Sequence, residues 1–287
     1  MENKWSAFSR RRFLTTSLGV ATTVQLHAAR SLGFLPQSAV CKLTPEQEVG
    51  PYYVADELLR SNIAEGKAGL PLRLRIVLLE ARSCQPLANA AIDIWHCDAL
   101  GLYSGFTSQN PMGPEGPPPG YDPQHSGNHS GPSEGMGPPP QNHPTDKLTF
   151  LRGIQITGPD GAVNFTTIFP GFYMGRTNHV HFKVRLDGHR AGETYAAGHT
   201  SHIGQVFFPE DVAAELMLHE PYSRHEIHRT TQAEDDVFGD QEGRLSIASL
   251  QPAGLDKKAG LRCELVATVD RAATPAPARR IGGPPPR

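Results

Sequence analysis

The chain has 287 residues, of which 38% are hydrophobic, so it can bury the core of about one domain once its two ends and a long insert are set aside. Its formal net charge of −2 argues against nucleic-acid binding, and its apolar runs fall short of the roughly 20 residues that span a bilayer. With 26 Pro and 29 Gly, the composition favours a loop-rich β protein over a helical one.

The N-terminus has the features of an export signal. Three arginines, Arg10 to Arg12, precede a mildly apolar run over 15–29, and this pattern resembles a twin-arginine signal peptide at 1–29. The resemblance implies export of a folded protein to a periplasmic or extracellular space, with any cofactor inserted before export. A basic tail without a targeting role is the alternative.

Cysteine usage agrees with an oxidising destination. The four cysteines are an even number, which predicts one or two disulfides. A Cys84–Cys97 pair is disfavoured, because Cys84 falls in a predicted turn and Cys97 at the far end of the strand that follows. The other pairings stay open, and buried free thiols are an alternative. The cysteines are Cys41, Cys84, Cys97 and Cys263.

Short strands separated by turns make up the domain that we predict at 30–271. Apolar runs bounded by Gly, Pro and polar residues mark each strand. The first two strands are expected to form a hairpin around a polar turn at 82–89, and a Pro-Asp-Gly turn at 159–161 joins the third and fourth. One helix is predicted at 210–218. The predicted strands are 72–80, 90–97, 150–157, 162–168, 203–208, 244–250 and 262–269.

These elements predict an all-β fold, a two-layer antiparallel β-sandwich with long loops and one short helix. The segment 108–146 is rich in Pro, Gly, Ser and His without an apolar period, so we predict a flexible insert there. Its histidines at 125, 129 and 143 are irregularly spaced, which argues against a second metal site. The Pro- and Arg-rich tail at 272–287 is predicted to be disordered.

The stretch from Phe169 to Lys183 contains a phenol, a guanidinium and two imidazoles. Side chains alternate along a strand, so His179 and His181 share one face while their apolar neighbours can bury on the other. A Pro-Gly turn before the strand allows Tyr173 to fold back over it. Tyr103, in the loop after the second predicted strand, is a further candidate ligand. A His-x-His pair alone is weak evidence for a metal site, and the added phenols strengthen it.

Other histidines and aromatics have two interpretations. His96 shares a strand face with apolar residues, which favours a hydrogen-bonded core histidine over a metal ligand. Tyr52 and Tyr53 follow a Gly-Pro turn and are expected either to line a cleft or to pack in the core.

The order of these motifs resembles the intradiol ring-cleavage dioxygenases over roughly 41–270, in a secreted subgroup. That family holds a non-haem ferric ion with two tyrosinates and two histidines. The resemblance implies Fe(3+) bound by Tyr103 and His179 in equatorial positions and by Tyr173 and His181 in axial ones. The matching motifs, in chain order, are Gly50-Pro51-Tyr52-Tyr53, Trp95-His96, Gly101-x-Tyr103-Ser104, Pro170-Gly171-x-Tyr173, Arg176, His179-x-His181 and Gln205.

The resemblance also implies a reaction, in which a catecholic diol chelates the iron and O2 cleaves its ring between the two hydroxylated carbons. Tyr173 would be displaced by the diol, Arg176 would stabilise negative charge on the ring, and Gln205 would help by hydrogen bonding. Phenolate oxygen stabilises ferric iron, whereas zinc sites more often use thiolate, imidazole or carboxylate. Catechol-cleaving members dimerise through a helical N-terminal domain that this sequence does not match, so the oligomeric state stays open, a homodimer included.

Three departures from better-known members border the predicted pocket, so the diol itself is not fixed. The Tyr173–His179 loop is shorter, the insert after Tyr103 is long, and Gln205 lies farther from His181 across a predicted loop at 187–200. Two alternatives are an exported iron-binding β-sandwich without turnover and a β-sandwich that binds sugar or protein. The arginine of the motif favours an enzyme, because an iron carrier has no use for that charge.

Overall fold

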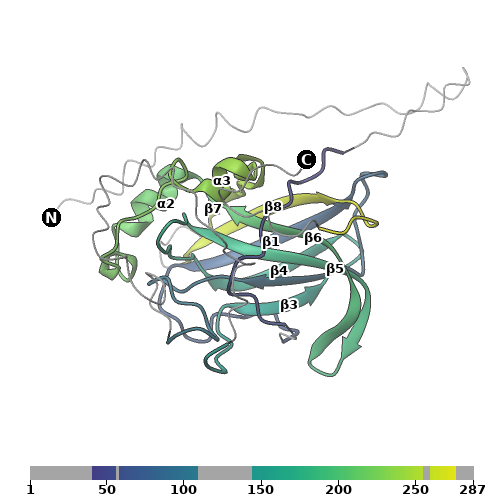
Figure 1. The fold of residues 1–287 in the computed structure, drawn as a ribbon, viewed down its shortest axis with the longest axis horizontal. Helices are drawn as coiled ribbons and strands as arrows, with labels where there is room; N and C mark the ends of the chain where they lie inside the picture. Colours follow the sequence, from purple (N-terminus) through teal and green to yellow (C-terminus); the bar gives the residue numbers. More distant parts are fainter. Residues whose placement is uncertain (1–40, 56–57, 109–143, 255–258, 276–287) are drawn as a thin grey trace, which may run out of the picture. The chain divides into compact units, whose positions relative to one another are not determined.

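The computed structural model describes residues 41–55, 58–108, 144–254 and 259–275, all within a compact unit at Ala39–Arg287 (Figure 1). The predicted signal peptide at 1–29, most of the predicted insert at 108–146 with its three histidines, and most of the predicted tail at 272–287 lie outside the described residues.

Two four-stranded sheets form a β-sandwich, which confirms the predicted fold class. The first sheet has the spatial order β4 (Ala162–Ile168), β1 (Pro71–Glu80), β8 (Leu261–Val269) and β7 (Ser249–Pro252). The second has the order β3 (Arg152–Ile156), β2 (Ala91–Trp95), β5 (His179–Ala191) and β6 (Thr194–Phe207). Strands β1 and β8 pair in parallel, so the sandwich is not wholly antiparallel as predicted.

Alternation along the strands builds the core between the sheets. On β1 the alternate apolar side chains are buried while Arg73 between them is exposed, and on β5 the residues Val180, Phe182 and Val184 are fully buried in the same cluster. Each such side chain contributes about 1.5–3 kcal/mol when it leaves water. The same alternation leaves His179 on the opposite face of β5, as the sequence predicts.

The hairpin predicted between the first two strands is wrong, because β1 and β2 lie in different sheets. The chain does reverse after β1, where Leu79 bridges Pro86 and Leu87 N donates to Leu78 O at 2.9 Å. It then crosses to the second sheet, and the 159–161 turn likewise carries it from β3 in one sheet to β4 in the other. The apolar pattern of a strand does not report which sheet the strand joins.

The helices lie outside the sheets. Helix α2 (Glu210–Met217) matches the prediction, but a second helix, α3 (Asp236–Asp240), corrects the expectation of one. Five residues are too few to show a helical apolar period. The chain also forms 3₁₀ turns at Tyr222–Arg224 and Gly243–Ser246, so the strand predicted at 244–250 begins only at Ser249. None of the helices in the described ranges has the length and apolar character needed to cross a membrane.

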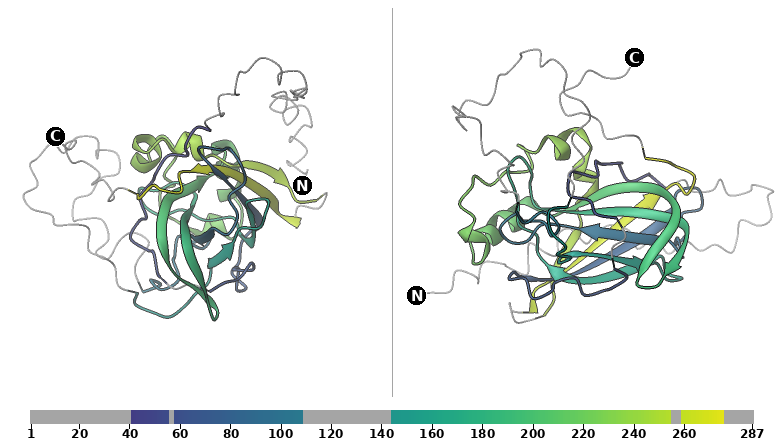
Figure 2. Two further views of the ribbon diagram at one scale, coloured as in Figure 1. Left: turned by 90° about the vertical axis from the view of Figure 1, so that its right-hand side faces the viewer. Right: turned by 60° about the horizontal axis from the view of Figure 1, so that its bottom comes forward.

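Strands β5 and β6 continue well past β2 as a long hairpin (Figures 1 and 2). The loop predicted at 187–200 is therefore mostly strand. Its tip lies between Ala191 and Thr194, where Gly192 has a φ of 61°, a conformation that glycine adopts without strain.

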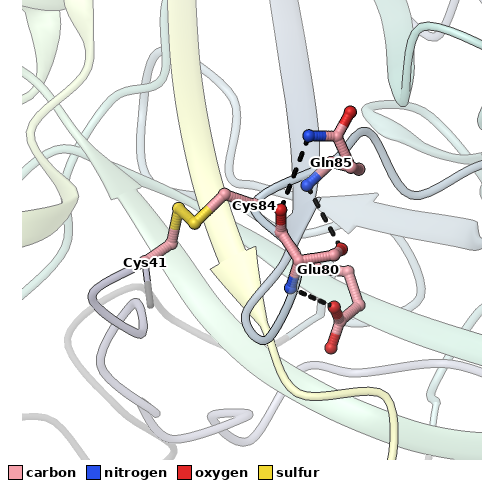
Figure 3. Close-up of a disulfide and its surroundings, with 5 residues drawn as sticks. Cys41, Glu80, Cys84 and Gln85 are labelled. Atoms are coloured by element: carbon pink, nitrogen blue, oxygen red, sulfur yellow. Dashed lines mark hydrogen bonds between the residues drawn. A yellow bond between two sulfur atoms is a disulfide. The ribbon is translucent and has the colours of Figure 1, made fainter. Parts of the chain in front are cut away.

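A disulfide joins Cys41 to Cys84 in the turn after β1 (Figure 3). That turn is closed by backbone hydrogen bonds from Cys84 N to Glu80 O at 2.8 Å and from Glu80 N to Gln85 O at 2.9 Å. Cys97 and Cys263 are buried free thiols. The structure thus selects one of the pairings left open and confirms that Cys84 and Cys97 do not pair.

Candidate active site

Paired positions on β2, β5 and β6 form a row of side chains on the outer face of the second sheet. His181 on β5 lies opposite Trp95 on β2 and opposite Gln205 on β6, and His179 lies opposite Phe207. Side chains at paired positions lie on the same face, so the row is continuous across three strands. All five are buried.

A one-residue bulge brings Gln205 into this row. From the hairpin tip to the Arg185–Thr200 pair the register is constant, and beyond that pair it shifts by one, which leaves Ser201 as the extra residue. A shift of one residue exchanges the two faces of a strand. Without the bulge, Gln205 would face the sandwich core instead of the side of His181.

Two loops bring the predicted phenol ligands over the row. Tyr103 comes from the loop after β2, and its Oη lies 3.4 Å from His179 Nε2. Tyr173 comes from the loop before β5, and its ring centroid lies 5.6 Å from that of His179 and 5.8 Å from that of Tyr103. Arg176 N donates to Tyr173 O at 3.0 Å and Gly175 has a φ of 79°, so a tight turn folds the phenol back over the strand.

The two imidazoles present their Nε2 atoms to each other at 3.1 Å. His179 Nδ1 donates to the carbonyl oxygen of Thr177 at 2.6 Å, so the neutral ring carries its lone pair on Nε2. Burial, and then the charge of Arg176, hold the pKa of His179 well below its usual range. Burial, and then His179, do the same to the pKa of His181. Both rings are therefore neutral, which is the form that binds a metal.

Close packing fixes His181. Its ring stacks on Trp95 with centroids 4.9 Å apart and an interplanar angle of 1°. Gly50 has a φ of 68°, and a Cβ there would lie 3.0 Å from His181 Cε1, so the Gly-Pro turn needs its glycine. Tyr52 stacks on Tyr103 at 4.5 Å, whereas Tyr53 donates from Oη to Asp93 at 3.0 Å. The sequence left both tyrosines with two expected positions, in a cleft or in the core. In the structure Tyr52 lines the cluster and Tyr53 packs behind it.

The donor set fits the predicted ferric ion. Burial raises the pKa of Tyr103 and of Tyr173, so both phenols stay protonated until a cation is near, and a trivalent metal supplies that charge. Within the described ranges, no group of three or more His, Cys, Asp or Glu side chains is placed to hold a metal. Two phenolic oxygens with two imidazole nitrogens suit Fe(3+) better than zinc.

Arg176 joins the cluster to residues that the sequence did not predict. Its Nε donates to both carboxylate oxygens of Asp235 at 3.1 Å, and its Nη2 donates to Gln205 Oε1. Its Nη1 lies 3.5 Å from both Tyr173 Oη and Glu48 Oε1. Neither carboxylate stands in a pattern that marks it, since each lies in a loop far along the chain from the metal stretch.

His96 is a core residue, as its position in the strand predicts. Its Nδ1 donates to Cys97 O at 2.8 Å and its Nε2 accepts from Thr167 Oγ1 at 2.7 Å. Burial lowers the pKa of His96 to about 4. A cavity of about 650 Å³, lined by Glu80 and Asp270 among others, contains none of the predicted site residues.

Sequence comparisons give no match, since no protein-family model and no curated protein matches the chain significantly. Among solved structures, an intradiol ring-cleavage dioxygenase from Tetranychus urticae is 29% identical with a TM-score of 0.64, covering 82% of this chain and 97% of that one. Catechol 1,2-dioxygenase from Acinetobacter is 20% identical with a TM-score of 0.48, covering 83% and 67%. Hydroxyquinol 1,2-dioxygenase from Pseudomonas putida is 16% identical with a TM-score of 0.46, covering 81% and 67%.

The match to the Tetranychus enzyme includes nearly all of that protein and most of this chain. The chain is therefore similar, across most of its length, to an intradiol ring-cleavage dioxygenase, which confirms the resemblance and the enzyme class predicted from the sequence.

Proposed function

We propose that the protein is a non-haem ferric dioxygenase that uses O2 to cleave a catecholic ring between its two hydroxylated carbons. The observation that carries the proposal is the buried cluster in which Tyr103, Tyr173, His179 and His181 converge beside Arg176. The likeness to the Tetranychus enzyme supports the same reaction class. When bound, the ferric ion would supply Lewis acidity that draws electron density from the chelated diol.

The four predicted ligand side chains differ in how freely they can move. His179 and His181 stand on the paired part of β5, and His181 is held on both sides by its strand partners. Tyr173 stands on a loop, and its Oη already has Arg176 Nη1 at 3.5 Å as an alternative partner. Tyr173 is therefore the ligand best placed to make room for a diol, because its phenol can move towards a waiting donor.

Arg176 supplies the positive charge beside the ring. Burial works against its charged form, but Tyr173, Asp235 and Glu48 together raise the pKa of Arg176, so it stays protonated. Gln205 orients it, since its Oε1 accepts from the guanidinium while its Nε2 donates to Glu48 O at 3.1 Å. A fixed donor of this kind stabilises charge most strongly where water is excluded.

Exclusion of water follows from the packing. His179, His181 and Gln205 are at most 1% exposed, and Arg176 is 7% exposed. Half-buried Tyr52 stacks on the ring of buried Tyr103. In so dry a site each charge acts through a lower dielectric than in water, which strengthens its effect on the bound ring.

An experiment on the purified full chain tests the proposal. Protein grown with ample iron should contain about one iron per chain and show the broad visible band of ferric tyrosinate, which shifts when a catechol is added without O2. Admission of O2 should then consume the diol. Stoichiometric zinc in a colourless protein would contradict the iron assignment.

The second candidate is an exported iron carrier without turnover. The network around Arg176 favours the enzyme. Asp235, Glu48 and Gln205 hold its guanidinium in place, and Tyr173 Oη is the one predicted iron-donor atom among its hydrogen-bond partners in the described residues. A carrier would keep its iron and colour but leave catechol, protocatechuate and hydroxyquinol intact.

We also propose that the protein is exported as a folded chain through the twin-arginine route. The paired arginines support this, and so does the Cys41–Cys84 disulfide, because disulfides persist in oxidising compartments. Replacing Arg10 and Arg11 by lysine should leave the precursor in the cytoplasm. Export that continues in this variant would point to another route.

A further inference from the structure

Asp235 is a buried carboxylate at the edge of the cluster. It is the N-cap of α3, and its side chain is 0% exposed. Three donors converge on it: Arg176 Nε lies 3.1 Å from each oxygen, Thr177 N donates to Oδ2 at 2.9 Å, and Phe238 N donates to Oδ1 at 3.0 Å. A buried carboxylate is stable only when paired and hydrogen-bonded, and this one is both.

The pairing uses one edge of the guanidinium and so fixes the rest of it. A guanidinium is planar, with its five N–H donors in a rigid fork. With Nε held by Asp235, the two terminal nitrogens of Arg176 are left for other partners: Nη1 lies 3.5 Å from Tyr173 Oη, and Nη2 donates to Gln205 Oε1. Asp235 therefore helps to set the orientation of the charged Arg176 guanidinium relative to the cluster.

The same carboxylate also holds the backbone next to a predicted metal ligand. Thr177 N donates to Asp235, and Thr177 O accepts from His179 Nδ1 at 2.6 Å. Thr177 thus connects Asp235, the N-cap of α3, to the hydrogen bond that leaves the lone pair of His179 on Nε2. Partners of this kind orient metal-binding imidazoles in proteins generally.

We propose that Asp235 is a positioning residue for ring cleavage, which acts by holding the guanidinium of Arg176 in its working orientation. Helix α3, which lies outside the sandwich, is through this residue part of the frame of the site. The inference rests on the proposed function, because the orientation matters only if Arg176 takes part in turnover.

The test is a double-mutant cycle on the iron-loaded full chain. Asp235→Asn keeps the size and one oxygen that can cap Phe238 N, since asparagine is as good an N-cap as aspartate, but it removes the charge that holds Arg176 and the oxygen that accepts from Thr177 N. In the wild-type background it should lower kcat for catechol by roughly tenfold with KM little changed, while the iron content and visible band persist. In an Arg176→Ala background it should lower kcat by no more than about twofold, because the guanidinium is gone and only the contact with Thr177 N is still lost.

Asp236→Asn is the matched control, because Asp236 is exposed in the same helical turn and has no bond to Arg176. It should leave kcat at the wild-type value. If Asp235→Asn does not fold, Asp235→Glu takes its place in the same cycle, since the longer side chain keeps the charge but displaces the guanidinium.

Two results would overturn the inference. Equal losses of kcat in both backgrounds would show that Asp235 acts independently of Arg176, and loss of iron together with activity would show a purely structural role. Failure of the proposed function looks different: the wild type would cleave no diol, or Arg176→Ala would be as active as wild type. If the enzyme is active but Asp235→Asn lowers kcat equally in both backgrounds, only the role proposed for Asp235 is wrong, and the proposed function stands.

Discussion

His181 and Gln205 lie directly opposite each other on β5 and β6, although the whole length of a hairpin separates them along the chain. Their pairing depends on the extra residue at Ser201, which places Gln205 on the imidazole face. The departure noted in the sequence, a long separation between these two residues, is therefore compatible with a site in which they are neighbours.

Loss of the Gln205 amide should weaken the site without removing the iron. Gln205→Met preserves volume but leaves Arg176 Nη2 and Glu48 O without this partner. We expect an iron-loaded, coloured protein that is about 1–3 kcal/mol less stable to urea and has a lower kcat. Gln251→Met, at an exposed position on β7, should change neither quantity. Full activity in Gln205→Met would remove the role of this residue.

The two cluster tyrosines should both contribute to the visible band. Tyr103→Phe and Tyr173→Phe each remove one phenolic oxygen from the donor set and should each change the band, while the double variant should abolish it. Tyr53→Phe is the matched control, since its hydroxyl donates to Asp93 and not to the cluster. An unchanged band in either single variant would exclude that tyrosine as a ligand.

Arg176 should matter for turnover and not for iron binding. Arg176→Ala should retain iron and colour while kcat falls about 10²- to 10³-fold, the scale for removal of one electrostatic donor. Arg176→Lys should recover little, because a point charge cannot bond to Asp235 and Gln205 through a planar fork. Equal cleavage by wild type and Arg176→Ala would contradict the catalytic assignment.

Glu48 should bias the site towards cationic diols. Its carboxylate is 15% exposed and 3.5 Å from Arg176 Nη1, whose charge Asp235 already balances. Dihydroxyphenylethylamine should bind more tightly than dihydroxyphenylacetate, by roughly tenfold at an intermediate dielectric. Anaerobic titration at about pH 8 measures this, because burial raises the pKa of Glu48 and the carboxylate must be ionised. Glu48→Gln should reduce the ratio of the two diols' affinities. An unchanged ratio in this variant would contradict the prediction.

The disulfide should stabilise the fold. Cys41 and Cys84 enclose a loop with a sequence separation of 43, so replacing both by serine should lower the free energy of unfolding by about 2–4 kcal/mol. Urea denaturation measures the loss. Wild type in a strong reductant is the control and should approach the variant, whereas equal stability of oxidised and reduced protein would contradict the prediction.

Local patterns predicted the parts of the site that local patterns can encode. Alternation placed His179 and His181 on one face, and the apolar neighbours of His96 marked it as core. Tyr173 does fold back over the strand as predicted, but the turn that folds it is Tyr173–Arg176 with Gly175 and not the Pro-Gly pair. The order of the motifs also pointed to the fold, which the structural match confirms.

Features set by distant contacts escaped the sequence. Asp235 lies in an ordinary helix cap, and only folding brings it to Arg176. The apolar strands β1 and β2 looked like a hairpin, because alternation reports a buried face and not the sheet that buries it. The bulge at Ser201 carries no distinctive residue type, so the true register of Gln205 was not predictable.

The identity of the product tests the central claim most directly. Iron-loaded protein is mixed with catechol, protocatechuate and hydroxyquinol in isotope-labelled O2, and the products are identified by mass spectrometry. We expect, for at least one diol, a ring-opened acid with two new carboxyl groups, whose mass is that of the diol plus both labelled oxygen atoms. A semialdehyde, formed when the ring is cleaved beside the two hydroxylated carbons, would contradict the proposed reaction. So would a quinone, or a failure to consume any of the three diols.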